Sequence, residues 1–253
     1  MSFRILVNPA SGGGKAMERV KPVAQLLRDA GADVQVVVSL GADHSVTEVG
    51  VAAAEGQTVV ACGGDGMVAS IAGEVVAHGV TFGIIPSGRG NDFARQLGLL
   101  DATPADTAHT LLHGTAAHVD VLRVGGRVVL GSVYAGVDSL ASEIVDGAQW
   151  LPGALQYPYA AVRSLLTYQP TSYTLEIDGE THAFDAFSVV IANSGYYGKG
   201  MHVAPAAAVD DGLLDVVVIP KGSRLKLIRL MPKVYDGSHV DLPEVLTLSL
   251  IHI

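Results

Sequence analysis

A length of 253 residues allows one large domain or two ordinary ones, and either arrangement buries a substantial core. Hydrophobic residues make up 49% of the chain and charged residues only 16%, which excludes an intrinsically disordered protein. The formal net charge of −9, without any basic run, excludes a general nucleic-acid binder. The single cysteine, Cys62, excludes a disulfide framework and a cysteine-rich zinc site and indicates a reducing compartment.

The chain starts without a charged segment followed by an apolar one, so we expect no leader peptide. No run approaches the roughly 18 consecutive apolar residues that a membrane-spanning helix requires. We therefore expect a cytoplasmic protein whose contact with a membrane is at most peripheral.

The first half of the chain alternates apolar strands with helices. Strands are predicted at residues 3–7, 34–39, 58–62 and 82–86, and helical patterns at 20–30, 45–54 and 67–78. Continuous apolar strands of this kind imply an α/β domain whose parallel sheet is covered on both faces. Three glycine-bearing loops, after the first, third and fourth strands, then open at the carboxyl edge of the sheet, where such sheets bind ligands.

The loop after the third strand, Gly63-Gly64-Asp65-Gly66, combines a glycine turn with an acidic residue. A glycine turn between a strand and a helix lets backbone N–H groups and the positive helix end approach a phosphate. Asp65 would repel a bare polyphosphate, so its presence favours a divalent cation between the carboxylate and the phosphates. The turn therefore predicts a nucleotide-triphosphate site with magnesium, and an ordinary turn aspartate is the alternative.

Two familiar nucleotide motifs do not fit. Gly64 to Ala69 matches the dinucleotide fingerprint G-x-G-x-x-G/A, but the next strand ends in Pro86 and Ser87 instead of the acidic residue that would hold a ribose. Gly14-Lys15 suggests a P-loop, but Ala16 stands where a magnesium-binding hydroxyl belongs.

The second half is rich in strands of antiparallel character. Residues 119–124 and 128–134 flank a Gly125-Gly126 hairpin signal, a helix is predicted at 155–167, and strands at 173–177 and 184–192 flank Asp178-Gly179-Glu180. Another strand is predicted at 213–219. We therefore expect an α/β nucleotide-binding catalytic domain over residues 1–119 and a β-rich, sandwich-like second domain over residues 120–247.

Five motifs in this order resemble the catalytic domain of the diacylglycerol kinase and sphingosine kinase superfamily of lipid kinases, and the soluble bacterial members most closely. They are NPASGGG from Asn8, GGDG from Gly63, PSGRGNDFAR from Pro86, NSGYYGKGM from Asn193 and APAAAVDDGLLD from Ala204. The resemblance implies an ATP- and Mg²⁺-dependent kinase that phosphorylates the hydroxyl of diacylglycerol or a related lipid. Its partners would be that lipid at a membrane surface and, as a homodimer, a second copy of the chain.

The resemblance also implies a role for individual residues. The nucleotide would be bound by Asn8, Ser11, Gly12, Ser39, Gly63, Gly64, Asp65, Gly66, Met67, Gly88, Arg89, Gly90 and Asn91. Asp65, Asp92 and Asp120 match the acidic positions linked to the catalytic magnesium, and phosphoryl transfer needs this charge neutralisation. For Asp92 a helix N-terminal charge is the alternative, and for Asp120 a strand-edge carboxylate without a ligand.

In the second domain, Asp211 matches a side-chain ligand of a structural metal, with the carbonyls of Ala208 and Leu213 beside it. A turn aspartate in the Asp210-Asp211-Gly212 sequence is the alternative interpretation.

The chain departs from the family pattern at four positions. Met67, Ala69 and Ser70 stand where many members have a threonine and an Asn-Glu pair, and Arg89 replaces a common threonine. These departures leave two other functions open: another kinase of the GGDG group, acting on NAD or a sugar phosphate, and a noncatalytic regulator that binds a nucleotide or lipid.

The general base of the family lies in an Asp-Gly-Glu near the end of its members. Asp178-Gly179-Glu180 has these letters but lies between two strands, so we interpret it as a hairpin turn. We expect the true counterpart after residue 253. The last six residues, 248–253, are what the codons CTG TCT CTT ATA CAC ATC would encode. That DNA resembles a transposase adapter, so we predict a non-native tail; a native β-strand is the alternative. Resequencing the source locus tests this prediction.

Overall fold

The computed structural model describes residues 1–251, and its chain forms two compact units. The first contains Met1–Leu130 together with Gly198–Gly200, and the second contains Gly131–Tyr197 and the chain from Met201 onward. The chain leaves the first unit after Leu130, later than the predicted boundary at 119/120. The reason is that the β5–β6 hairpin (Leu122–Val124 and Arg127–Val129) packs on α3 (Asp65–His78) of the first unit.

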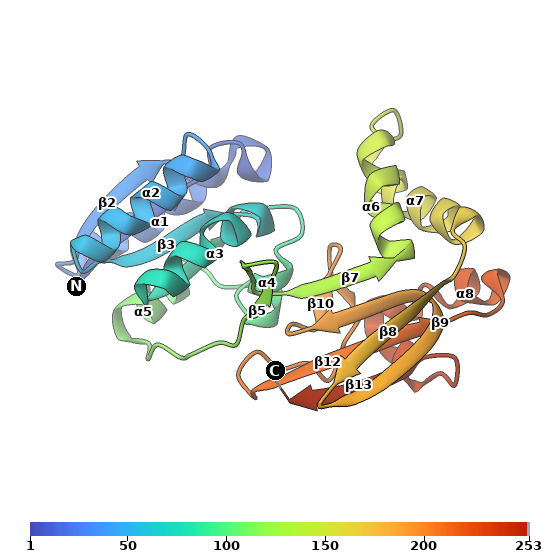
Figure 1. The fold of residues 1–253 in the computed structure, drawn as a ribbon. Coiled ribbons are helices and arrows are strands. Elements are labelled where there is room, and N and C mark those ends of the chain that lie inside the picture. The colour runs from blue at the N-terminus through green and yellow to red at the C-terminus, as the bar shows by residue number, and fades with distance from the viewer. Residues whose placement is uncertain (252–253) are drawn as a thin grey trace. The chain divides into compact units, whose positions relative to one another are not determined.

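The sheet of the first unit is parallel, as its continuous apolar strands predicted. Its strands are β1 (Ser2–Val7), β2 (Asp33–Val38), β3 (Thr58–Gly63) and β4 (Phe82–Pro86), in the order β2-β1-β3-β4 (Figure 1). Parallel strands place their carboxyl ends at one edge, so the loops after β1, β3 and β4 open there together.

Helices cover both faces of this sheet. On one face, α1 (Ala16–Asp29) and α5 (Pro104–His113) pack on the β1 side chains Phe3, Ile5 and Val7. On the other face, α2 (Ala42–Ala54) packs against α3 and contacts β1 and β3. The short helices η1 (Ser11–Gly14) and α4 (Asp92–Gln96) follow β1 and β4 directly. The loops at the carboxyl edge are therefore anchored on a rigid layer.

The second unit is built on an antiparallel sheet. Its order is β13-β12-β9-β7, with β8 also paired to β9: β7 is Ser132–Gly136, β8 Thr171–Ile177, β9 Glu180–Ala192, β12 Leu213–Pro220 and β13 Leu246–Ile251. Two further short strands, β10 (Tyr196–Tyr197) and β11 (Met201–His202), pair with each other. The helices are α6 (Val137–Gly147), α7 (Gly153–Thr167), α8 (Arg224–Leu230), α9 (Lys233–Asp236) and η2 (Ser238–Asp241).

The predicted Gly125-Gly126 hairpin is confirmed, but its second strand is shorter than predicted. β5 and β6 pair on either side of the turn, whereas residues 132–136 form a separate strand, β7, that pairs with β9. Gly131 separates the two strands, and the apolar pattern on either side of it does not reveal the change of partner. The five residues of β7, Ser132 to Gly136, instead join the main sheet by pairing with the distant strand β9.

The second predicted hairpin is confirmed. Asp178 and Gly179 both have positive φ, 49° and 82°, and join β8 to β9 in a tight turn. At the chain end, β13 pairs with β12, as the β-favouring residues of the tail allow, and residues 252–253 of the predicted adapter-encoded tail lie outside the described residues.

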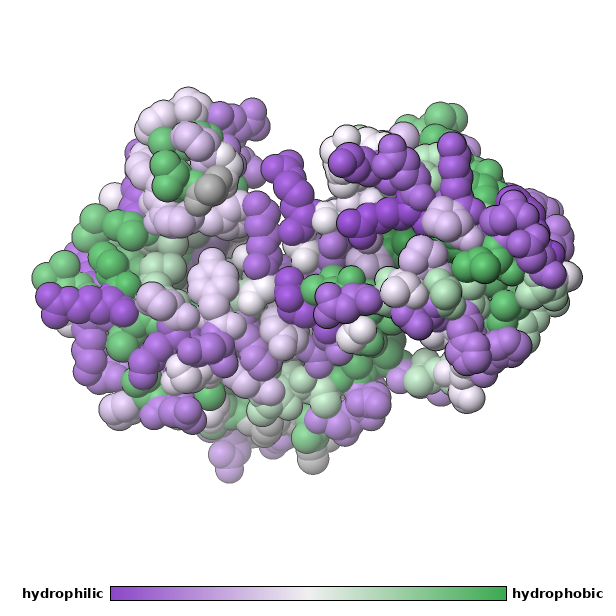
Figure 2. All heavy atoms as spheres, turned by 180° about the vertical axis from the view of Figure 1, so that it is seen from behind, coloured by the Kyte–Doolittle hydropathy of each residue, from purple (hydrophilic) through white to green (hydrophobic). Residues whose placement is uncertain are grey.

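Within residues 1–251, no helix is both long enough and apolar enough to cross a membrane. On the face of the molecule shown in Figure 2, hydrophilic and hydrophobic residues are interspersed, without one continuous apolar belt.

Candidate active site

The loop after β1 lies against the loop after β4. Asn8 begins it: the backbone N–H of Asn8 donates to the carbonyl of Cys62 at 3.0 Å, and its side-chain Oδ1 accepts from the N–H of Ala10 at 3.1 Å. At Gly12, φ is +61°, and a Cβ atom would stand 2.7 Å from the carbonyl oxygen of Ser87. Only glycine satisfies both the backbone conformation and this close approach.

The loops after β3 and β4 are in direct backbone contact. A Cβ atom added to Gly88 would stand 2.4 Å from Cα of Gly64, and one added to Gly64 would stand 2.9 Å from Cα of Gly88. The N–H of Ser87 donates to the carbonyl of Gly63 at 2.8 Å. The three predicted loops therefore come together, and glycine is required where their backbones meet.

Asp65, the first residue of α3, ties these two loops together. Its Oδ2 accepts from the N–H of Asn91 at 2.7 Å, and its Oδ1 lies 3.4 Å from the N–H of Phe93. Asn91 is in the left-handed conformation, with φ 55° and ψ 43°. Its amide side chain accepts from the N–H of Gly88 and donates to the carbonyl of the same residue. Asp65 is therefore held in one orientation by the loop after β4.

Asp92 is held by a segment far away in the sequence. Its Oδ2 accepts from the N–H of Lys199 at 2.9 Å, and its Oδ1 accepts from the N–H of Gly200 at 2.7 Å. Both carboxylate oxygens of Asp92 are therefore bound by this distant segment. The segment 198–200 belongs to the first unit, so this arrangement lies within that unit.

The carboxylates of Asp65 and Asp92 approach each other over Gly90. A Cβ atom at Gly90 would stand 2.7 Å from Oδ2 of Asp65 and 3.4 Å from Oδ2 of Asp92. Burial raises the pKa of Asp92, and the neighbouring Asp65 carboxylate raises it further, while the N–H groups of Lys199 and Gly200 lower it. Two oriented carboxylates at one point are a donor set that suits Mg²⁺, which prefers oxygen ligands and would relieve their repulsion.

Asp120 lies in the segment between α5 and β5 and is half-buried. Its part in the magnesium network stays a prediction.

Ser39, Arg89 and Ser11 have different environments. The hydroxyl of Ser39 lies 2.7 Å from the hydroxyl of Ser45, and its N–H donates to the carbonyl of Val7. Arg89 is exposed on the loop after β4, and Ser11 is buried in the loop after β1. These three residues lie on or beside the carboxyl edge, and their contact with a nucleotide stays a prediction.

Met67 lies beneath the glycine turn. It is only 7% exposed, and its Sδ would stand 2.6 Å from a Cβ atom at Gly63. Its N–H donates to the carbonyl of Gly64 at 3.0 Å. The side chain therefore supports the turn from within the core. The contact of Met67 with a nucleotide stays a prediction.

Two groups at this site were missed by sequence reasoning. Lys199 and Gly200 hold Asp92, and Arg19 donates to the carbonyl of Pro86 at 2.7 Å. The motif around Lys199 was visible in the sequence, but nothing in the sequence indicates that its backbone meets a residue 107 positions earlier.

In the second unit, Asp211 forms a turn. It is exposed, and its Oδ1 accepts from the N–H of Leu213 at 2.9 Å. Among the described residues, no group of three or more histidine, cysteine, aspartate or glutamate side chains is placed to hold a metal ion. A metal held by Asp211 with the carbonyls of Ala208 and Leu213 stays a prediction.

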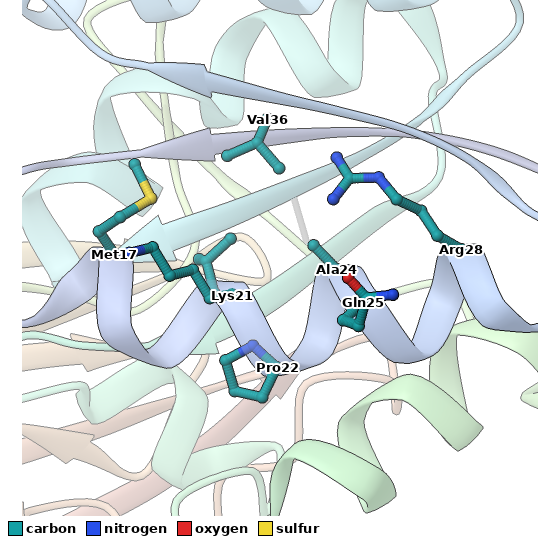
Figure 3. A pocket seen from close by; sticks show the side chains of 8 residues that line it. Met17, Lys21, Pro22, Ala24, Gln25, Arg28 and Val36 are labelled. Carbon is teal, nitrogen blue, oxygen red and sulfur yellow. The ribbon is translucent and has the colours of Figure 1, made fainter.

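A surface hollow of about 530 Å³ lies between α1 and β2 (Figure 3). It is lined by Met17, Val20, Lys21, Pro22, Ala24, Gln25, Arg28 and Val36. None of these is a predicted site residue, so this hollow is separate from the three loops.

Comparisons with known proteins agree with the fold and the loops. Residues 2–124 match the diacylglycerol kinase catalytic domain, and residues 131–252 match the YegS C-terminal NAD kinase beta sandwich-like domain. A diacylglycerol kinase of Mycobacterium tuberculosis (strain H37Rv) is 33% identical over 249 residues, which cover 96% of this chain and 81% of that protein.

A diacylglycerol kinase of Bacillus subtilis (strain 168) is 25% identical over 94% of this chain and 80% of that protein. The crystal structure of a diacylglycerol kinase from Bacillus anthracis superposes with a TM-score of 0.74 over 98% of this chain and 83% of that chain. Its 20% sequence identity makes this a likeness of fold.

Proposed function

Because the chain belongs to the diacylglycerol kinase-like lipid kinase superfamily, we propose that it transfers the γ-phosphate of ATP to the hydroxyl of diacylglycerol or a related lipid. The observation that carries this proposal is the meeting of Asp65 and Asp92 over Gly90, where three glycine loops come together at the carboxyl edge of the sheet.

The loops supply what a polyphosphate needs. Gly12 and Gly88 let the backbones approach closely, and the N-terminus of α3 adds its positive dipole end. A Cβ atom at Gly66 would meet nothing within 4 Å, so the turn leaves space beside Asp65. ATP would lie along this edge, with Asn8 and Ser11 at one side.

Asp65 and Asp92 would hold Mg²⁺, and Asp120 is proposed as the third carboxylate. The ion would neutralise charge on the transferring phosphoryl group. The protein's own contribution is orientation: the N–H groups of Asn91, Lys199 and Gly200 hold the two carboxylates in place before the nucleotide arrives.

The lipid hydroxyl would reach this site from a membrane surface, with peripheral contact by the protein. The second unit would bind a structural metal through Asp211 and the carbonyls of Ala208 and Leu213. The lipid acceptor is preferred over NAD or a sugar phosphate because the catalytic-domain model and the curated relatives are those of diacylglycerol and lipid kinases.

The experiment measures Mg²⁺-dependent ATP binding by calorimetry and transfer of ³²P from ATP to diacylglycerol in mixed vesicles. Asp65→Asn and Asp92→Asn should each weaken Mg²⁺-ATP binding about tenfold or more, because each removes a ligand charge. Asp101→Asn is the control, since Asp101 is an exposed aspartate of the same unit.

Transfer is measured with diacylglycerol, NAD and a sugar phosphate as acceptors. Binding of ATP without transfer to any acceptor would replace the kinase with a nucleotide-binding regulator. Transfer to NAD or to a sugar phosphate, and not to lipid, would overturn the choice of acceptor.

A further inference from the structure

Three consecutive residues, Gly198, Lys199 and Gly200, have positive φ angles of 64°, 67° and 92°. Glycine adopts this left-handed region freely, whereas any side chain with a Cβ atom is strained there. A third glycine would therefore suit the backbone better than lysine does. Strained residues of this kind persist where the side chain has a use that outweighs the cost, so Lys199 is a candidate for a functional residue.

The position of Lys199 indicates what that use is. Its N–H and the N–H of Gly200 bind the two oxygens of the Asp92 carboxylate. Its side chain starts over Gly90: a Cβ atom there would stand 3.8 Å from Cγ of Lys199, and the same point lies 2.7 Å from Oδ2 of Asp65. The lysine side chain thus leaves the backbone directly beside both carboxylates.

Charge at this point favours a phosphate as the ligand of the ammonium group. Asp65 and Asp92 together balance one divalent cation, which leaves the charge of the polyphosphate uncompensated. The guanidinium of Arg95 lies 3.2 Å from the position of a Cβ atom at Gly200. Lys199 is a second cationic residue of this edge, and its side chain starts beside the space where phosphates would lie.

We propose, on the basis of the proposed function, that Lys199 binds the phosphates of ATP through its ammonium group while its backbone N–H orients Asp92. A lysine ammonium is a compact charge that suits a phosphate oxygen, and its flexible stem reaches over Gly90. The segment 198–200 thereby completes the nucleotide site of the first unit, although it comes from the second half of the sequence.

Lys199→Gly separates the two roles of the residue. It keeps the backbone N–H that binds Asp92 and relieves the left-handed strain, so the thermal midpoint should stay the same or rise. It removes the ammonium group, so Mg²⁺-ATP affinity should fall about tenfold or more, as expected for loss of a charge-assisted contact. Affinity for adenosine, which has no phosphate, should not change. Lys199→Arg should recover most of the ATP affinity.

Asp178→Gly is the matched control. Asp178 also has a positive φ, 49°, but lies in the β8–β9 turn, so its replacement relieves the same strain without touching the site. It should raise the thermal midpoint and leave ATP affinity unchanged.

The outcomes separate this inference from the proposed function. Failure of the wild-type chain to bind Mg²⁺-ATP would overturn the proposed function itself. Normal ATP affinity of Lys199→Gly would overturn the role of Lys199 alone. Equal losses of ATP and adenosine affinity, or a lowered thermal midpoint without recovery by arginine, would assign Lys199 a structural role and overturn the inference as well.

Discussion

Replacing Gly88 with alanine tests whether the loops after β3 and β4 must touch through their backbones. The new Cβ atom would stand 2.4 Å from Cα of Gly64 and 2.9 Å from Oδ1 of Asn91. Neither neighbour can move easily. The contact with Gly64 is with its backbone, which is fixed at the start of α3. The side-chain amide of Asn91 is hydrogen-bonded to both the N–H and the carbonyl of Gly88.

The expected loss follows from this geometry. Overpacking at a site that cannot relax costs about 1–3 kcal/mol, and backbone neighbours place Gly88→Ala near the upper end of that range. For a unit of this size, about 3 kcal/mol lowers the midpoint of thermal unfolding by roughly 10 °C. Because the shift also moves Asn91, which orients Asp65, Mg²⁺-ATP affinity should fall with it.

The assay is thermal unfolding followed by circular dichroism without nucleotide, with Gly66→Ala as the matched control. A Cβ atom at Gly66 would meet nothing within 4 Å, and Gly66 lies inside α3, where alanine stabilises a helix by up to about 1 kcal/mol relative to glycine. Gly66→Ala should therefore leave the midpoint unchanged or raise it. Equal midpoints for the two variants would refute the backbone contact between the loops.

Three further changes test the interior of each unit. Arg4→Met should lower the free energy of unfolding by about 3 kcal/mol in urea titrations. Arg4 is only 6% exposed, and its replacement removes the guanidinium that binds Glu48 and Gln57. An unchanged midpoint of urea unfolding would contradict this. Burial raises the pKa of Asp138, so its carboxylate destabilises the fold as pH rises through that raised value. At pH 8 the free energy of unfolding of Asp138→Asn should therefore exceed that of the wild type by about 1 kcal/mol, and this difference should close toward pH 4. Burial lowers the pKa of His239, so the free energy of unfolding should fall as the pH drops from 7 to 5. His239→Gln should show a smaller fall over the same range. Parallel pH profiles of the variant and the wild type would contradict this role of His239.

The first unit illustrates how much of a fold is local. The apolar runs of β1 and β3 and the helical patterns between them predicted the parallel sheet, because strands buried on both faces carry apolar residues at every position. The three loops at the carboxyl edge followed from the parallel order alone. The Asp178-Gly179 turn could also be predicted from the sequence, since both residue types are common at positive φ.

Contacts between distant segments could not be predicted from the sequence in this way. β7, residues Ser132 to Gly136, pairs with β9. An apolar pattern predicts that these residues form a strand but does not predict which strand they pair with. The side chain of Met67 packs in the core beneath Gly63, and its place after the glycine turn does not reveal this packing.

Residue types and spacing alone predicted the strand and helix pattern and the three glycine loops, because they are sufficient for local structure. That Asp65 and Asp92 meet over Gly90, and that Lys199 and Gly200 bind Asp92, depends on the packing of the first unit. Those distances join residues that are far apart along the chain, and only packing of the whole unit sets them.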